Sequence, residues 1–166
     1  IKHSKPAILI REPKDQMISY CIGHGFTFEN LSQNNFIIVK KAFNNYQKFI
    51  KYWQIELENK INKKDYIVLN FKNIVSNPKE ALECLLKFYG YKINKELIIR
   101  AAEIHQKDNT LEYLKNVKIN KIRFTDPEKK RKLGEEIAKI IDKIDINNKL
   151  ETTYDSFIEK FSQKFP

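Results

Sequence analysis

An arginine and a serine, eight residues apart, are the side chains in this sequence best suited to binding chemistry. Arg11 follows four apolar residues, and Ser19 lies within a predicted helix. A guanidinium offers a planar fork of N–H donors that matches a phosphate, and a serine hydroxyl adds one neutral donor. An isolated pair of this kind is more often a strand-end arginine and a helix-surface serine, so the elements that carry the two residues decide the interpretation.

The residues around this pair predict a strand that passes directly into a helix. Ala7–Ile10 is too short and too sharply bounded for a helix and is typical of a buried parallel strand. Pro13 suits the first turn of a helix because it lacks the N–H that would be unsatisfied there. Asp15 favours the same turn through the helix dipole, and glycines at 23 and 25 end the helix. A strand that is followed directly by a helix forms an anion site at the carboxyl end of a sheet.

The segment as a whole, Arg11-Glu12-Pro13-Lys14-Asp15-Gln16-Met17-Ile18-Ser19, resembles a known motif. The motif is R-x-P-[KR]-D-x-x-x-S of the sulfotransferases that use 3′-phosphoadenosine 5′-phosphosulfate (PAPS). In that family its arginine and serine hold the 3′-phosphate of the cofactor. The resemblance therefore implies this role for Arg11 and Ser19, and it implies a P-loop-NTPase-like sulfotransferase fold.

A second segment resembles the same family in part. A predicted strand over 65–71 is followed by Asn77-Pro78, which suit the start of a helix. The family reads V-L-x-x-x-Y-E-D-L-x-x-x-P here. Phe71 stands at its tyrosine, which implies a contact between the Phe71 ring and adenine. Lys72 and Asn73 replace its acidic pair.

Two further motifs of the family are missing from this chain. An Arg-Lys-Gly triplet that adds to the 3′-phosphate contacts is absent, and Lys121 and Arg123 are its nearest substitutes. The loop K-[ST]-G-[ST]-[TS]-W, which binds the 5′-phosphosulfate upstream of the arginine motif, has no counterpart, because no glycine precedes Arg11. We therefore expect either an N-terminal part beyond these 166 residues or a degenerate relative of the family.

The remaining segments predict mainly helices. Apolar residues recur at three- and four-residue steps, so each helix has a core-facing stripe. The predicted helices cover roughly 36–59, 78–89, 94–106, 127–145 and 150–165. In the third of them the stripe consists of Leu97, Ile98, Ala101, Ala102 and Ile104. The prediction is one α/β domain over residues 1–166, with parallel strands flanked by helices and a helix-rich C-terminal portion.

The composition of the chain indicates which kinds of ligand and which cellular location suit it. The net charge of +10 suits an anionic ligand such as a nucleotide, a nucleic acid or a polyanionic sugar. The lysines alternate with asparagine and isoleucine throughout, so nucleic acid is not favoured. No apolar run is long enough to span a membrane. Cys21 and Cys84 form no metal-ligand or disulfide pattern, which favours free thiols in a reducing, cytoplasmic setting and no metal site.

Together these features predict a sulfotransferase that moves a sulfuryl group from PAPS to a hydroxyl of a small molecule or glycan. This chain would carry the 3′-phosphate-binding part and would be inactive alone, and no residue is assigned to catalysis. A basic helical module is one alternative, and it would bind nucleic acid through contacts between its basic residues and the phosphates. A non-catalytic sulfotransferase remnant that serves in protein interactions is another.

Overall fold

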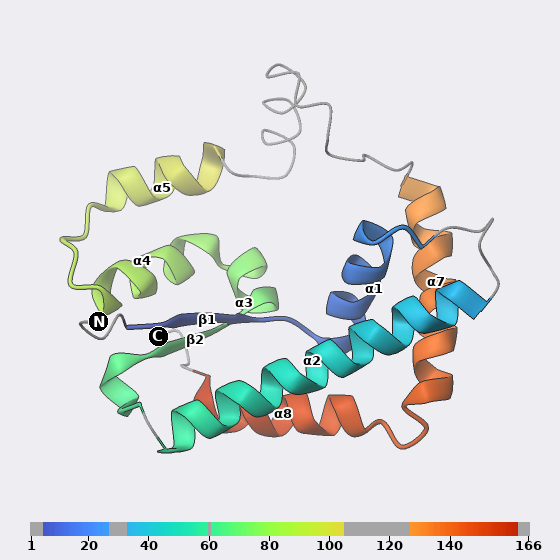
Figure 1. The fold of residues 1–166 in the computed structure, drawn as a ribbon. Coiled ribbons are helices and arrows are strands. Elements are labelled where there is room, and N and C mark those ends of the chain that lie inside the picture. Colours follow the sequence, from blue (N-terminus) through green and yellow to red (C-terminus); the bar gives the residue numbers. More distant parts are fainter. Residues whose placement is uncertain (1–4, 27–32, 60, 105–126, 163–166) are drawn as a thin grey trace.

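Two parallel strands lie at the centre of the fold. The computed structural model describes residues 5–26, 33–59, 61–104 and 127–162 (Figure 1). Strands β1 (Ala7–Ile10) and β2 (Ile67–Asn70) pair in register, with Ala7 opposite Ile67 and Ile10 opposite Asn70. The predicted parallel pair, connected through a long helix, is therefore confirmed. The second strand begins at Ile67 and ends at Asn70, one residue before the predicted end.

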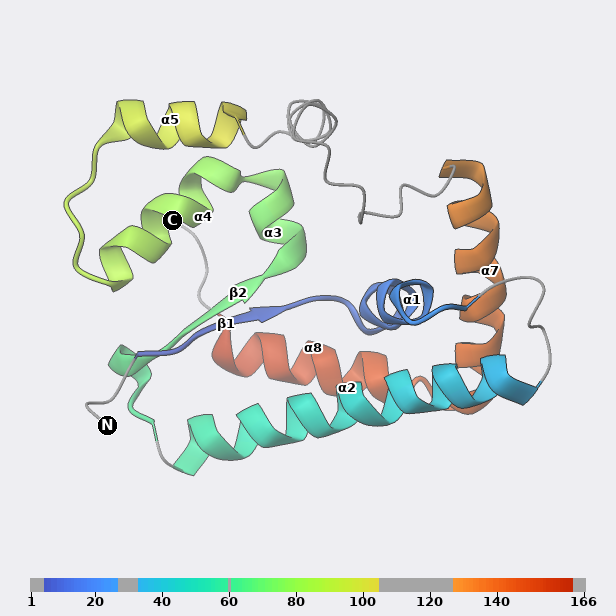
Figure 2. The ribbon, with the colours of Figure 1, turned by 45° about the horizontal axis from the view of Figure 1, so that its top comes forward.

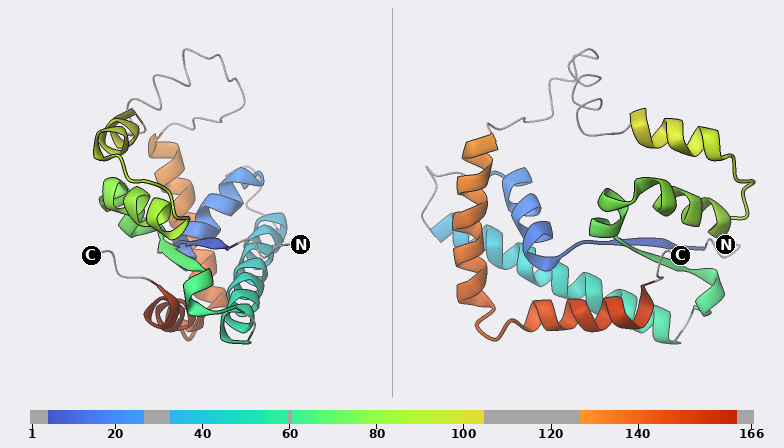
Figure 3. Two further views of the ribbon diagram at one scale, coloured as in Figure 1. Left: turned by 90° about the vertical axis from the view of Figure 1, so that its left-hand side faces the viewer. Right: turned by 180° about the vertical axis from the view of Figure 1, so that it is seen from behind.

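Helices cover the strands on both sides, and the views in Figures 2 and 3 agree on this arrangement. On one side lie α2 (Gln33–Asn59) and α8 (Lys149–Phe161), and on the other lie α3 (Phe71–Ser76), α4 (Pro78–Phe88) and α5 (Lys95–Ile104). Helices α1 (Pro13–Gly23) and α7 (Pro127–Ile144) pack together beyond the carboxyl ends of the strands. A short 3-10 turn, Lys63–Asp65, precedes β2.

The core lies between the strands and helices α1, α2, α7 and α8, because the apolar stripes of these helices converge there. On α8 the buried positions follow steps of four, three and four residues: Leu150, Tyr154, Phe157 and Phe161. On β1 the alternation of a strand buries Ile8 and Ile10 and leaves Leu9 52% exposed. Within the described residues β1 pairs with β2 alone, so its other side is an open sheet edge.

The layer formed by α4 and α5 is less deeply packed than the sequence predicts. Ile98 is buried on α5, whereas Leu97 and Ile104 are 61% and 53% exposed. Ala101 and Ala102 are half-buried. The reason is that, among the described elements, α5 packs mainly on α4, so a narrow stripe of this helix meets a described neighbour. The prediction that all five apolar positions of α5 belong to the core is therefore wrong for Leu97 and Ile104.

No described helix combines the length and the apolarity that crossing a bilayer requires. The cytoplasmic location stays a prediction.

The two thiols should differ sharply in reactivity. Cys21 is 0% exposed, and burial raises its pKa to about 11. Only about 0.1% of such a thiol is thiolate at pH 8, and the thiolate is the reactive form. Cys84 on α4 is half-buried. We expect native Cys84→Ala protein, which retains only Cys21, to react with a thiol reagent at least about tenfold more slowly than Cys21→Ala protein. Equal rates in the native state would contradict this placement of α1, and equal rates in denaturant provide the control.

Candidate functional site

Arg11 lies in the short connection between β1 and α1, as the sequence predicts. Pro13 is buried in the first turn of α1 and Asp15 is also in that turn. The backbone carbonyl of Arg11 accepts a hydrogen bond of 2.8 Å from the hydroxyl of Tyr46 on α2. This bond fixes the backbone at the point from which the Arg11 side chain projects.

The guanidinium of Arg11 has two charged or aromatic neighbours and one unsatisfied donor. Its central carbon lies 4.8 Å from the centroid of the Phe71 ring, which is a cation–π distance. Its Nη2 lies 3.6 Å from Oδ2 of Asp15, and both of these side chains are partly exposed. Its Nε is buried and has no hydrogen-bond partner within the described part of the chain. A buried donor without a partner is unfavourable, so this group favours an added acceptor.

Phe71 reaches Arg11 from the end of the second strand. Asn70 ends β2, and its side-chain Oδ1 accepts a 2.8 Å hydrogen bond from the N–H of Lys72, so it caps α3. Phe71 is consequently the first residue of a helix rather than the last residue of a strand, which corrects the predicted boundary. The neighbouring ends of the two parallel strands bring Phe71 beside Arg11. Its contact with adenine stays a prediction.

Ser19 lies one helical turn beyond Asp15, on the same side of α1. Its side chain is exposed. Within the described residues no hydrogen bond joins Ser19 to Arg11, and Asp15, one turn before Ser19, forms an ion pair with Arg11. Their convergence on one phosphate stays a prediction. Lys121 and Arg123, the two remaining predicted cofactor-binding residues, lie outside the described residues.

Two buried tyrosines, which the sequence analysis did not assign to the site, hold the ends of the strands. Tyr46 bonds to Arg11 at the end of β1, and the hydroxyl of Tyr154 on α8 accepts a 2.7 Å bond from Nδ2 of Asn70 at the end of β2. Burial raises the pKa of both hydroxyls, that of Tyr154 to about 12, so both stay protonated near neutral pH. A buried tyrosine needs a hydrogen-bond partner for its hydroxyl, so a tyrosine within the apolar stripe of a helix is the feature of the sequence that indicates such a contact.

A cavity of about 310 Å³ adjoins the arginine. Its volume lies at the low end of the range for small-molecule sites. Apolar and aromatic side chains supply most of its wall and a few polar groups converge on it. The lining residues are Leu9, Arg11, Gln16, Met17, Tyr20, Ala42, Asn45, Tyr46 and Phe49.

Lys14, inside the motif, is used by the fold instead of the site. Its Nζ lies 2.9 Å from Oδ1 of Asp142 on α7. The hydrogen bond to Asp142 raises the pKa of Lys14, although burial opposes this. Lys14 therefore ties α1 to α7, whereas Arg11 lies at the end of β1 beside Phe71.

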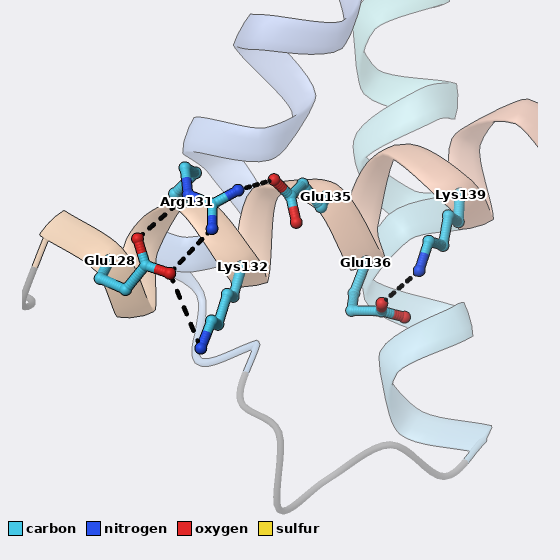
Figure 4. A network of polar contacts seen from close by, with 6 residues as sticks. All are labelled: Glu128, Arg131, Lys132, Glu135, Glu136 and Lys139. Atoms are coloured by element: carbon cyan, nitrogen blue, oxygen red, sulfur yellow. Dashed lines mark hydrogen bonds and ion pairs between the residues drawn. The ribbon is translucent and has the colours of Figure 1, made fainter.

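At the start of α7, Arg131 and Lys132 pair with carboxylates of the same helix (Figure 4). Arg131 bonds to Glu128 at 2.8 Å and also pairs with Glu135, and Lys132 lies 3.6 Å from Glu128. Further along, a 2.6 Å bond joins Lys139 to Glu136. These three cations thus lie on a solvated helix face with ion pairs along it.

The carboxyl of Glu151 on α8 has its pKa raised mainly by burial, with Asp155 adding to the rise and Lys14 opposing it. A raised pKa in the folded state means that ionisation of this group disfavours the fold as pH rises through that value. We expect Glu151→Gln to raise the melting temperature at pH 7 and to change it little below pH of about 4. Glu159→Gln, at an exposed position of the same helix, is the control. A stabilisation that persists at low pH would contradict this reading.

Within the described residues no group of three or more histidine, cysteine or acidic side chains is placed to hold a metal ion. Comparison of the chain with protein-family models, curated proteins and solved structures found no significant match.

Proposed function

We propose that this chain is the 3′-phosphate-binding part of a PAPS-dependent sulfotransferase with a P-loop-NTPase-like fold. The whole protein would transfer a sulfuryl group from PAPS to a hydroxyl of a small molecule or glycan. The observation that carries the proposal is the placement of Arg11, which combines the Phe71 ring under its guanidinium with a buried, unpaired Nε. It stands at the carboxyl end of a parallel strand, where α/β sheets bind their ligands.

A phosphate would compete well with Asp15 for this guanidinium. An exposed carboxylate pair of the i,i+4 kind is worth only about 0.3–0.5 kcal/mol, and the Arg11–Asp15 pair is partly exposed. A charge-assisted hydrogen bond to a phosphate is worth about 1.5–3 kcal/mol and can be doubled by the planar fork of arginine. Binding would also give an acceptor to Nε. These magnitudes favour the ligand over the internal ion pair.

The local charges support one nucleotide site over a nucleic-acid face. On α7, Arg131, Lys132 and Lys139 pair with carboxylates of their own helix. Elsewhere Lys5 and Lys14 pair with Asp65 and Asp142. A cation that is already paired gains less from binding a phosphate than a free cation does, so these five residues contribute less to a nucleic-acid face. A non-catalytic remnant would retain the same nucleotide site, so the transfer activity of the whole protein separates that alternative from an enzyme.

Chemical-shift mapping by NMR tests the proposal on the 166-residue chain. Titration with adenosine 3′,5′-bisphosphate should perturb the amides around Arg11, Ser19 and Phe71 in a saturable way. Perturbations confined to α7 or spread over the lysines would reject the site.

Ser19→Ala should weaken binding of the bisphosphate by about fivefold, the value of one hydrogen bond that is neutral on the protein side. Ser19 is exposed, so its loss should leave the fold intact. The matched control is Ser156→Ala, an exposed helical serine on α8, which should bind as the wild type does. Unchanged affinity in Ser19→Ala, measured by calorimetric titration, would remove Ser19 from the site.

A further inference from the structure

The C-terminal helix α8 contacts the end of β2, beside the candidate site, through Tyr154. Tyr154 is buried, and its neighbours on the helix, Leu150 and Phe157, pack into the core. Its hydroxyl lies 2.7 Å from Nδ2 of Asn70, a residue 84 positions earlier in the chain. Because a buried hydroxyl is costly unless it is bonded, this contact holds both partners in place.

Asn70 is fixed at both ends of its amide. Nδ2 donates to Tyr154, and Oδ1 accepts the N–H of Lys72 at 2.8 Å. The second bond sets where α3 begins and therefore where Phe71 emerges. Phe71 in turn lies 4.8 Å from the Arg11 guanidinium. The chain of contacts from α8 to Arg11 thus passes through two side-chain hydrogen bonds and one ring.

We propose that Tyr154 is a positioning residue that orients the Arg11–Phe71 pair through Asn70, so that α8 sets discrimination for a 3′-phosphate. The link to nucleotide discrimination rests on the proposed function, whereas the positioning of Arg11 does not. Tyr154 itself would touch no ligand.

Tyr89 offers a matched control for loss of one tyrosine hydroxyl. It follows α4, and its hydroxyl donates a 3.2 Å bond to the backbone carbonyl of Lys5, before the start of β1. Tyr89→Phe therefore removes a bond next to the same sheet, but at the opposite end from Arg11. An effect of Tyr154→Phe that Tyr89→Phe lacks is therefore specific to the end of the sheet that carries Arg11.

The first measurement is the NMR shift of the Arg11 Nε–H in the free protein, which is sensitive to the Phe71 ring. Phe71→Leu gives the reference value without the ring. We expect Tyr154→Phe to move this resonance measurably toward that reference and Tyr89→Phe to leave it in place. A wild-type shift of Arg11 in Tyr154→Phe would overturn the proposal, whatever the nucleotides do.

The second measurement is the affinity ratio between adenosine 3′,5′-bisphosphate and AMP. Tyr154→Phe should lower this ratio by about two- to tenfold, the range that one neutral hydrogen bond is worth. Combining it with Phe71→Leu should add little, since both changes act on one contact. An unchanged ratio in Tyr154→Phe, or full additivity with Phe71→Leu, would overturn the role in discrimination. A wild type that does not distinguish the two nucleotides would reject the proposed function and this role together, while the Arg11 resonance still decides the positioning.

Discussion

Arg11→Ala should lower the affinity for adenosine 3′,5′-bisphosphate by about ten- to a hundredfold while leaving that for AMP nearly unchanged. The reason is that the variant removes a charged partner, worth about 1.5–3 kcal/mol, from a phosphate that AMP lacks. The affinity of Arg11→Lys for the bisphosphate should lie between those of the wild type and Arg11→Ala, because lysine retains the charge but lacks the planar fork. Calorimetric titration of each variant with both nucleotides measures the effect.

Arg100→Ala is the matched control for loss of an arginine, since Arg100 is exposed on α5. It should leave both affinities unchanged. If Arg11→Ala instead weakens the two nucleotides equally, Arg11 contacts a group that they share, and the assignment of the 3′-phosphate is wrong.

Ile137→Ala should lower the free energy of unfolding by about 2–5 kcal/mol, the usual cost of truncating a buried isoleucine. Ile137 is 0% exposed and belongs to the core cluster, in the stripe of α7. Ile146→Ala is its control, because Ile146 is 82% exposed, and it should change stability by about 0.5 kcal/mol or less. Urea unfolding of both variants measures the difference. Similar effects of the two changes would contradict the packing of α7 on the core.

The end of the first strand and the start of the helix after it could be predicted because neighbouring residues specify both. Pro13 and the apolar run before Arg11 specify a strand end and a helix start without reference to distant residues. The end of β2 was misplaced because Phe71 is β-prone, although Asn70 carried the signal of a helix cap. Helix α3 has only six residues, too few to show a helical period.

Long-range partners explain what could not be predicted. The bonds from Tyr46 to Arg11 and from Asn70 to Tyr154 join residues 35 and 84 positions apart, and spacing along the chain does not reveal such pairs. Likewise, Lys14 occupies the basic position of the motif but pairs with Asp142 on a helix far away in the sequence. Leu97 is exposed because few of the described helices pack on α5. The apolar periodicity of α5 itself does not reveal which helices will be its neighbours.

The most direct test of the central claim is calorimetric titration of the wild-type chain with adenosine 3′,5′-bisphosphate and, separately, with AMP. The two ligands differ by the 3′-phosphate alone, so their affinity ratio isolates the group assigned to Arg11 and Ser19. We predict one site per chain and at least about tenfold tighter binding of the bisphosphate. Equal affinities would show that the chain has no 3′-phosphate site, and a basic nucleic-acid-binding module would then account better for its charge.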